Sequence, residues 1–370
     1  MNKYKVLYKY LFDLLVYLAS FLLAFRSIIM YSKIEYSVII DLVAPFSWLI
    51  LFLSIMCNGF AVREISLSII LMLFSLLVYK SSSSLIPFYS MLFFVASKNR
   101  NLNKIIFANF LGMLFAVIRV ILLAIGGKIP NIYYDGGMAL GFRNPNVLSF
   151  YIAAMLVYWV YLRYHKIDFF ELLFLFVIST PVHILTNSRT GLVLSLLILF
   201  FVFLTKTSYK MKSYFIRYSS VLCISIVLFC FLGIVLVNIN PIFAKVNSIL
   251  SGRFSLAQIY IGIYGLHPFG ANIDDARSYG FGNIVLDNGY ARLLINYGLY
   301  LVLFCGLYLG LLRNNRKYYK DVRLSIVVLI IFIGLVSETL WIPINSNILI
   351  CLSSVIFFDG SKKIKFGESL

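Results

Sequence analysis

Several arginines lie in polar, glycine-marked settings between long apolar stretches, where their side chains could bind phosphate. They are Arg143 in the run GFRNPN, Arg189 in NSRTG, Arg253 after Ser251-Gly252, and Arg292 shortly after Asp287. A guanidinium stays charged and donates paired hydrogen bonds from a planar fork, which matches phosphate oxygens. For any single arginine the alternative is contact with lipid headgroups or a local carboxylate. As a set they favour a diphosphate-binding surface.

Arg119 differs from this set because it lies within a long apolar run, AVIRVI. An arginine is costly to place inside an apolar segment, so its side chain is expected to face a polar interior. It is predicted either to contact the same anionic ligand or to tie helices together, and the first alternative is favoured.

Two further side chains could move a proton. Asp287 stands at the start of an apolar run and could deprotonate a hydroxyl. Asp also caps helix N-termini, and a carboxylate held by backbone amides is a poor base. His267, in LHPFG, is expected to be accessible, and imidazole titrates near neutral pH. Together with Arg189, which could stabilise a leaving phosphate, Asp287 and His267 are the candidate catalytic residues.

A second group of polar residues is predicted to line the outer cavity on which these arginines converge. Its members are Asn146, Asn288, Tyr290 and His183. For His183 the alternative is a hydrogen-bonded packing role. The chain carries no P-loop, HExxH or GxSxG motif and no acidic metal-binding cluster, so neither a metal site nor a cofactor is expected.

The elements that must position these residues are predicted to be membrane-spanning helices. Of 370 residues, 62% are hydrophobic and only 12% are charged. A soluble chain carries about 25% charged residues, whereas a bilayer accepts apolar side chains on every outward face. The expected fold is an all-α integral membrane protein, with residues 1–370 forming one multi-pass domain.

Twelve spans of roughly 20 apolar residues are predicted. They cover about 7–30, 37–57, 65–79, 85–97, 105–126, 147–164, 168–186, 190–205, 214–238, 288–312, 323–340 and 344–359, with a break at Ser81–Ser84. Most lysines and arginines then fall in alternate loops, which by the positive-inside rule places both termini in the cytoplasm. The net charge of +18 is thereby explained by basic residues in cytoplasmic loops, and no nucleic acid partner is expected.

Two loops on the opposite, outer side are too long to be simple connectors. The first covers about 127–146, and the second, between spans nine and ten, covers 239–287. Residues 246–260 of the second loop are amphipathic, which predicts a helix on the membrane surface or over a cavity.

The short motifs of these outer regions are similar to those of a known family. The chain resembles the Wzy-type repeat-unit polymerases of O-antigen and capsule synthesis, and the related O-antigen ligases. GFRNPN resembles a "PN" segment before a span, NSRTG an "SRTG" turn, and Ser251-Gly252-Arg253 an "SGR". HPFG resembles "NPxFG", and DNGYARLLINYG resembles "HNxYLxxLxxxG". The ligases place a histidine where Asp287 stands, and some polymerases carry aspartate there, which favours a polymerase.

The resemblance implies a glycosyltransferase at the outer face of the bacterial cytoplasmic membrane. Its substrates would be oligosaccharides on undecaprenyl diphosphate, and the growing glycan would leave its lipid carrier to join a fresh repeat unit. No metal is implied, so arginines would stabilise the leaving diphosphate. Membrane lipid is an expected contact, and a flippase and a chain-length regulator are expected partners.

Two other functions fit the same pattern of spans. A flippase for lipid-linked oligosaccharides would also have an even number of spans, but it should place polar residues along a central path and show related halves. A ligase would pass finished glycan to another acceptor, and only Asp287 argues against it.

Overall fold

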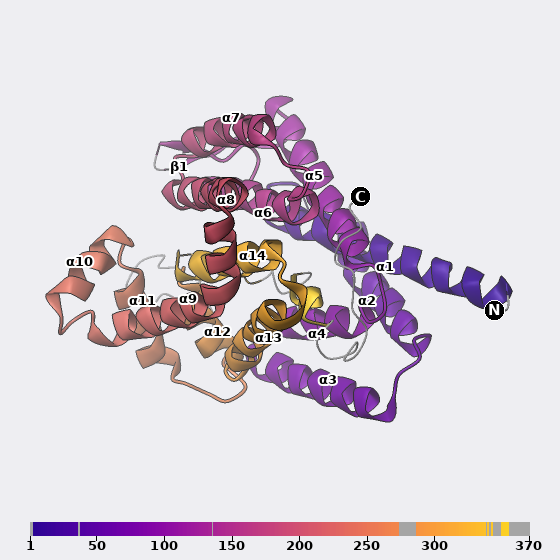
Figure 1. Ribbon diagram of the computed structural model, residues 1–370. Coiled ribbons are helices and arrows are strands. Elements are labelled where there is room, and N and C mark those ends of the chain that lie inside the picture. The colour runs from indigo at the N-terminus through magenta and orange to yellow at the C-terminus, as the bar shows by residue number, and fades with distance from the viewer. Residues whose placement is uncertain are drawn as a thin grey trace. The chain divides into compact units, whose positions relative to one another are not determined.

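Apolar helices make up most of the computed structural model (Figure 1), which describes residues 3–35, 38–134, 136–273, 286–337, 339, 342 and 349–354. Within these ranges six helices are long and apolar enough to cross a membrane: Tyr10–Met30, Val62–Ser82, Leu102–Ile125, Pro145–Arg163, Arg189–Thr207 and Tyr209–Leu236. Four more apolar helices are shorter. The chain therefore has the build of a helical membrane-embedded protein. The count of twelve spans and the cytoplasmic termini stay predictions.

The helices divide into two compact units. The first comprises Met1–Glu64, Leu92–Lys212 and Ser354–Leu370, and the second comprises Ile65–Met91 and Ser213–Ser353. Arg119, Arg143, His183 and Arg189 belong to the first unit. Arg253, His267, Asp287 and Arg292 belong to the second.

The first unit contains six principal helices and one short hairpin. Its elements are α1 (Lys3–Met30), α2 (Val38–Met56), α5 (Leu102–Ile125), β1 (Tyr133–Tyr134), β2 (Gly137–Met138), α6 (Pro145–Arg163), α7 (Phe169–Leu185) and α8 (Arg189–Thr207). The two strands pair antiparallel, with Tyr133 opposite Met138.

Close packing of α1 against α5 depends on small and polar residues. A methyl group on Gly112 of α5 would overlap the carbonyl oxygen of Phe21 in α1. Two buried side chains then cross the contact: Ser20 Oγ donates to the Ile105 carbonyl at 3.0 Å, and Asn109 Nδ2 donates to the Ser20 carbonyl at 3.2 Å. Small residues and hydrogen bonds are what hold helices together in lipid, where apolar contact alone is not selective.

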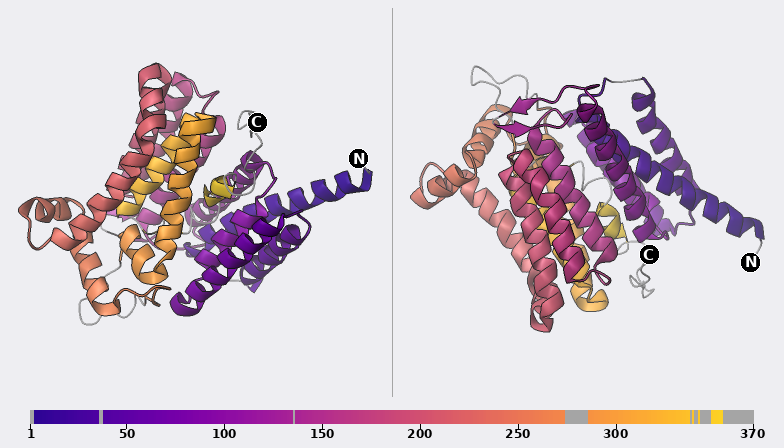
Figure 2. Two further views of the ribbon diagram at one scale, coloured as in Figure 1. Left: turned by 60° about the horizontal axis from the view of Figure 1, so that its bottom comes forward. Right: turned by 90° about the horizontal axis from the view of Figure 1, so that it is seen from above.

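Helix α6 is the most buried helix of the first unit and packs against α5, α7 and α8. Its Tyr151 and Tyr158 are fully enclosed. Figure 2 shows the β1–β2 hairpin at one end of the α6, α7 and α8 group, and β2 contacts α7. The hairpin therefore covers the end at which α6 and α8 begin.

The second unit is built from α9 and the helices that follow it, with most of α3 and the start of α4. Its elements are α3 (Val62–Ser82), α4 (Ile86–Ala96), α9 (Tyr209–Leu236), α10 (Pro241–Ile249), α11 (Arg253–Tyr264), α12 (Gly289–Tyr297), α13 (Tyr300–Asn314), the π-helix η1 (Asn315–Tyr319), α14 (Val322–Ser337) and the 3-10 helix η2 (Leu349–Ser353). The predicted break between spans three and four is confirmed, since α3 ends at Ser82.

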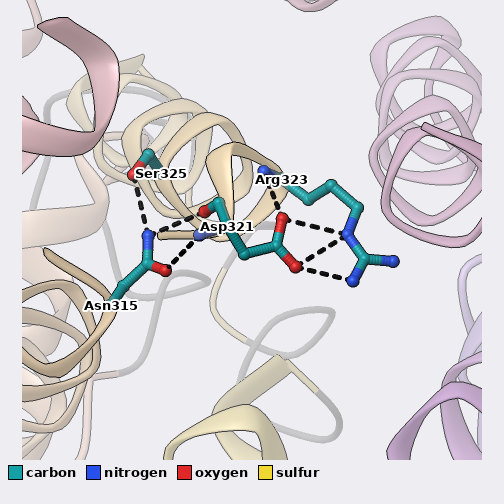
Figure 3. A network of polar contacts seen from close by, with 4 residues as sticks. All are labelled: Asn315, Asp321, Arg323 and Ser325. Carbon is teal, nitrogen blue, oxygen red and sulfur yellow. Dashed lines mark hydrogen bonds and ion pairs between the residues drawn. The ribbon is translucent and has the colours of Figure 1, made fainter. Parts of the chain in front are cut away.

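A buried polar network joins the start of η1, directly after α13, to α14 (Figure 3). The Arg323 guanidinium pairs with the Asp321 carboxylate at 2.6 Å, and their side chains are only 3% and 8% exposed. Asn315 donates to the Asp321 carbonyl and to Ser325 Oγ, at 2.7 and 3.2 Å. The charge of Arg323 is thus compensated inside the protein, as a buried charge must be.

Two predicted elements differ from the structure. Span 288–312 is divided into α12 and α13 at Gly298, which has a φ of +58°. The amphipathic stretch 246–260 is divided into α10 and α11 at Ser251 and Gly252, with φ of +56° and +79°. A left-handed residue ends a helix because the next turn cannot continue its hydrogen bonds. Most of the predicted span 344–359 lies outside the described residues.

Candidate functional site

In the first unit, α6 and α8 begin at the same end and approach closely there. A methyl group on Gly191, in the first turn of α8, would overlap Ser149 Oγ of α6. Only a residue without a side chain permits this contact. Since Arg143 just precedes α6 and Arg189 is the first residue of α8, the contact brings two predicted phosphate-binding arginines to one end of the unit.

His183 fixes this contact from within. Its Nδ1 lies 2.6 Å from Ser149 Oγ, and its Nε2 lies 2.8 Å from Ser195 Oγ. The imidazole is buried and joins α6, α7 and α8 through both of its nitrogens. His183 therefore has the packing role that the sequence left open, rather than the predicted place in a cavity.

The turn before Arg189 is held by backbone contacts. Asn187 has a φ of +49°, and the Ser188 N–H donates to the His183 carbonyl at 3.1 Å. Gly137 of β2 packs so closely on the Thr186 carbonyl that a methyl group there would overlap it. The NSRTG motif is thus a turn only over its first two residues, because Arg189 begins α8, where its side chain is exposed.

Arg143 is exposed at the start of α6. The Asn144 side chain caps the helix by accepting from the Asn146 N–H at 2.8 Å, and Pro145 occupies the first helical position. Asn and Pro are favoured at these positions because they satisfy or remove a free N–H. The predicted "PN" segment is therefore a helix start, which leaves Arg143 exposed just outside it. Asn146 is exposed as well.

Arg119 is exposed on α5, and its guanidinium lies 5.9 Å from the centre of the Phe25 ring of α1. This cation–π contact lies on the surface of the first unit, whereas the sequence predicted a polar interior. Position 119 is also within two turns of the end of α5 at Ile125, so the flexible side chain can extend toward that end.

In the second unit, Arg253 and Asp287 form an ion pair. Arg253 Nη2 lies 3.9 Å from Asp287 Oδ2, with the side chains 13% and 40% exposed. Arg253 is the first residue of α11, and Asp287 lies two residues before α12. The starts of two neighbouring helices therefore hold a cation and a carboxylate side by side. Their backbone N–H groups add positive potential at this point.

Sequence reasoning missed the residue that positions Arg253. Asn247 Oδ1 accepts from the backbone N–H groups of Phe254 and Ser255 at 2.8 and 3.3 Å, and Asn247 Nδ2 donates to Ser255 Oγ. The cap comes from α10, six residues before α11 begins. A usual N-cap lies directly before the first helical residue, so the spacing gave no indication of this role.

Asp287 is not the N-cap of α12, which was the alternative considered for it. The cap is Asn288, whose Oδ1 accepts from the Ala291 N–H at 2.9 Å and which also contacts Cys230 of α9. Asn288 is fully buried, and so is Tyr290, whose hydroxyl donates to the Phe332 carbonyl at 2.8 Å. Both residues therefore pack inside the unit in place of the predicted cavity lining.

His267 is exposed, as predicted, but its turn packs at the other end of α12. The Pro268 carbonyl accepts from the Leu299 N–H at 2.8 Å, and a methyl group on Gly298 would overlap the His267 carbonyl. His267 Nε2 lies 3.0 Å from the Tyr264 carbonyl and donates to it. The nine residues of α12 span about 13 Å. His267 and Asp287 therefore do not serve one hydroxyl together.

Arg292 lies one turn into α12 and is partly exposed. Among the described residues no group of three or more histidine, cysteine, aspartate or glutamate side chains could hold a metal ion.

No protein-family model, no curated protein and no solved structure matches this chain.

Proposed function

We propose that this protein polymerises lipid-linked oligosaccharide repeat units at the outer face of the cytoplasmic membrane. The growing glycan passes from undecaprenyl diphosphate to a new repeat unit. The proposal rests on the motifs of the sequence and on the Arg253–Asp287 pair. The transfer needs a cation for the leaving group and a proton acceptor for the attacking hydroxyl, and this pair offers both.

The chemistry assigned to the pair is a single displacement. A hydroxyl oxygen of the incoming repeat unit attacks the anomeric carbon of the growing chain, and the bond from that carbon to the diphosphate oxygen breaks. The bonding electrons leave with the diphosphate, where the Arg253 guanidinium stabilises the added charge. The hydroxyl proton passes to the Asp287 carboxylate, which is 40% exposed and does not serve as a helix cap.

Arg143 and Arg189 have a different part in the proposal. Both are exposed at the starts of α6 and α8, where their guanidinium groups and the helix N-termini favour an anion. Each is proposed to bind substrate phosphate. Arg119 and Arg292 are proposed as secondary contacts, since each lies within a helix instead of before one.

The test is the length of surface polysaccharide in the source bacterium. Deletion of the gene should leave single repeat units on the cell surface. Arg253→Ala and Asp287→Asn should each do the same, whereas Lys245→Ala is the matched control, because Lys245 is an exposed cation on neighbouring α10. Long polymer in both site variants would refute the proposal. Repeat units trapped inside the cell after deletion would show a flippase, and polymer that is not attached to its final acceptor would show a ligase.

A further inference from the structure

Lys33 is an exposed cation that the sequence assigned no role, and the fold places it beside Arg143. Residues 31–33 follow α1 and pair antiparallel with residues 141–143, with Ser32 opposite Phe142. The Lys33 N–H donates to the Gly141 carbonyl at 2.8 Å, and the Arg143 N–H donates to the Tyr31 carbonyl at 3.0 Å. Two segments that are more than 100 residues apart are thereby held in register.

The register decides which side chains share a face. Ser32 and Phe142 are both buried, so their side chains point into the unit. The residues on either side of a bridged pair point the opposite way. Lys33 and Arg143 are accordingly both exposed, diagonally across the bridge. Diagonal neighbours of an antiparallel pair lie about 7 to 8 Å apart, within reach of long side chains.

Gly141 stands opposite Lys33 in the bridge and is itself buried. A side chain there is excluded, because a Cβ would lie 2.7 Å from Ile129 Cδ1 and 3.0 Å from the Ala124 Cβ. Its φ of +86° adds a backbone requirement for glycine.

The bridge itself is rigidly supported. Ser32 Oγ donates to the Ile29 carbonyl at 2.7 Å and accepts from the Ile34 N–H at 3.2 Å, which fixes the chain where it leaves α1. The Tyr151 hydroxyl of α6 donates to the Ser27 carbonyl, and its ring packs on Phe142. The backbone positions of Lys33 and Arg143 are therefore set before any ligand binds.

We infer that Lys33 and Arg143 together bind one phosphate group of a phosphate ester at the membrane surface. The inference rests on the proposed function for the identity of that ester, an isoprenoid diphosphate. A phospholipid headgroup presents the same chemistry, so the test must separate the two sources. A lysine supplies a point charge and an arginine a planar fork, which suits them to different oxygens of one phosphate.

The experiment measures binding to the purified full-length protein in lipid nanodiscs. The probes are undecaprenyl diphosphate in neutral phosphatidylcholine nanodiscs and, separately, phosphatidylglycerol. Lys33→Ala should weaken binding of undecaprenyl diphosphate by about three- to fivefold, the scale of an exposed ion pair. Lys33→Arg should retain it. Lys128→Ala is the matched control, since Lys128 is exposed between α5 and β1 but is not part of the bridge.

Equal binding of both probes by the wild type and Lys33→Ala would overturn the inference, and so would an equal loss in Lys128→Ala. Loss of phosphatidylglycerol binding alone would support the anion site with a phospholipid as its ligand. The proposed function is tested separately, because its test measures polymer length in cells and the present test measures binding in nanodiscs. Normal polymer in the deletion strain would refute the polymerase while leaving the nanodisc result intact.

Discussion

Ser149 of α6 and His183 of α7 meet at 2.6 Å, between Ser149 Oγ and the imidazole Nδ1, beneath the helix start that carries Arg189. The other imidazole nitrogen contacts Ser195 of α8 at 2.8 Å. A buried polar group with both of its nitrogens satisfied specifies one arrangement of its neighbours. The three helices are thereby held in the register that places Arg189 at the end of the unit.

Replacement of His183 by leucine should destabilise the protein. Leucine fills a similar volume with an apolar side chain, but it leaves the Ser149 and Ser195 hydroxyls without their buried partner. This loss should cost about 2 kcal/mol in the free energy of unfolding. Denaturant titration in detergent micelles measures the change. His165→Leu is the control, because His165 is exposed, and its effect should stay within about 0.5 kcal/mol. Equal stability of the two variants would contradict the role of His183.

Gly191→Ala should disturb the same contact sterically. The added methyl group overlaps Ser149 Oγ and lies 3.2 Å from His183 Nδ1, so α6 and α8 must separate. Overpacking of this kind costs about 1 to 3 kcal/mol. Gly262→Ala provides the comparison, since Gly262 lies in α11 with nothing within 4 Å of an added Cβ. That variant should be neutral or slightly stabilised because alanine favours a helix. A stable Gly191→Ala protein would show that the two helices are not in contact there.

Asn247→Ala should act on the Arg253–Asp287 pair from a distance. The substitution removes the cap of α11, which costs about 1 to 2 kcal/mol, and it releases the helix start that positions Arg253. Polymer chains should shorten, as judged on gels of surface polysaccharide. Asn238→Ala is the control, since it loses only an exposed contact to Gln258 and should leave chain length unchanged. Full-length polymer from Asn247→Ala would show that the cap of α11 is not needed for polymerisation.

Arg100→Ala should be among the most destabilising changes in the first unit. Its guanidinium pairs with Asp13 at 3.0 Å and donates to Ser54 Oγ and the Ala96 carbonyl, while its side chain is 3% exposed. Burial lowers the pKa of Arg100, and the Asp13 carboxylate opposes that shift. Removing one partner of a buried pair costs about 3 to 5 kcal/mol.

Denaturant titration of Arg100→Ala should be compared with that of Arg217→Ala. Arg217 is an exposed cation near the start of α9, so its loss should change the free energy of unfolding by less than about 0.5 kcal/mol. If both variants unfold alike, the Asp13 pair contributes nothing to stability.

His267→Asn should affect polymer length less than Asp287→Asn. The turn of His267 packs at the C-terminal end of α12, and Asp287 lies before its N-terminal end. The exposed imidazole can thus be replaced with little effect on a proton acceptor at the opposite end of this helix, which spans about 13 Å. Gel analysis of polysaccharide from the two variants measures the difference. Loss of polymer in His267→Asn alone would show that His267, and not Asp287, accepts the hydroxyl proton.

Much of the local structure was predictable from the sequence. The long apolar runs predicted helices, and the resemblance placed GFRNPN directly before a span, where Asn144 caps α6 and Pro145 removes a free N–H. The four-serine run Ser81–Ser84 predicted the end of α3. These features depend on neighbours within one or two turns, so composition and spacing are sufficient to reveal them.

Other local features were hidden by an apolar pattern that continues through them. Hydropathy does not change at Gly298, yet its left-handed backbone separates α12 from α13. The amphipathic pattern of 246–260 likewise runs through Ser251 and Gly252, where the backbone separates α10 from α11. A glycine permits such a conformation without requiring it. At Gly298 the close packing of the His267 turn leaves no space for a side chain, so a glycine is required there.

By itself, the sequence determined that this chain is helical and apolar enough for a membrane, and it singled out arginines suited to phosphate. Only the tertiary structure decided how they are used. It paired Arg253 with Asp287, assigned the helix cap to Asn288, enclosed His183 between two serines, and set Lys33 beside Arg143. Helix propensity and hydropathy are sums over neighbouring residues. A partnership between distant side chains depends on which helix faces meet, and packing alone determines that.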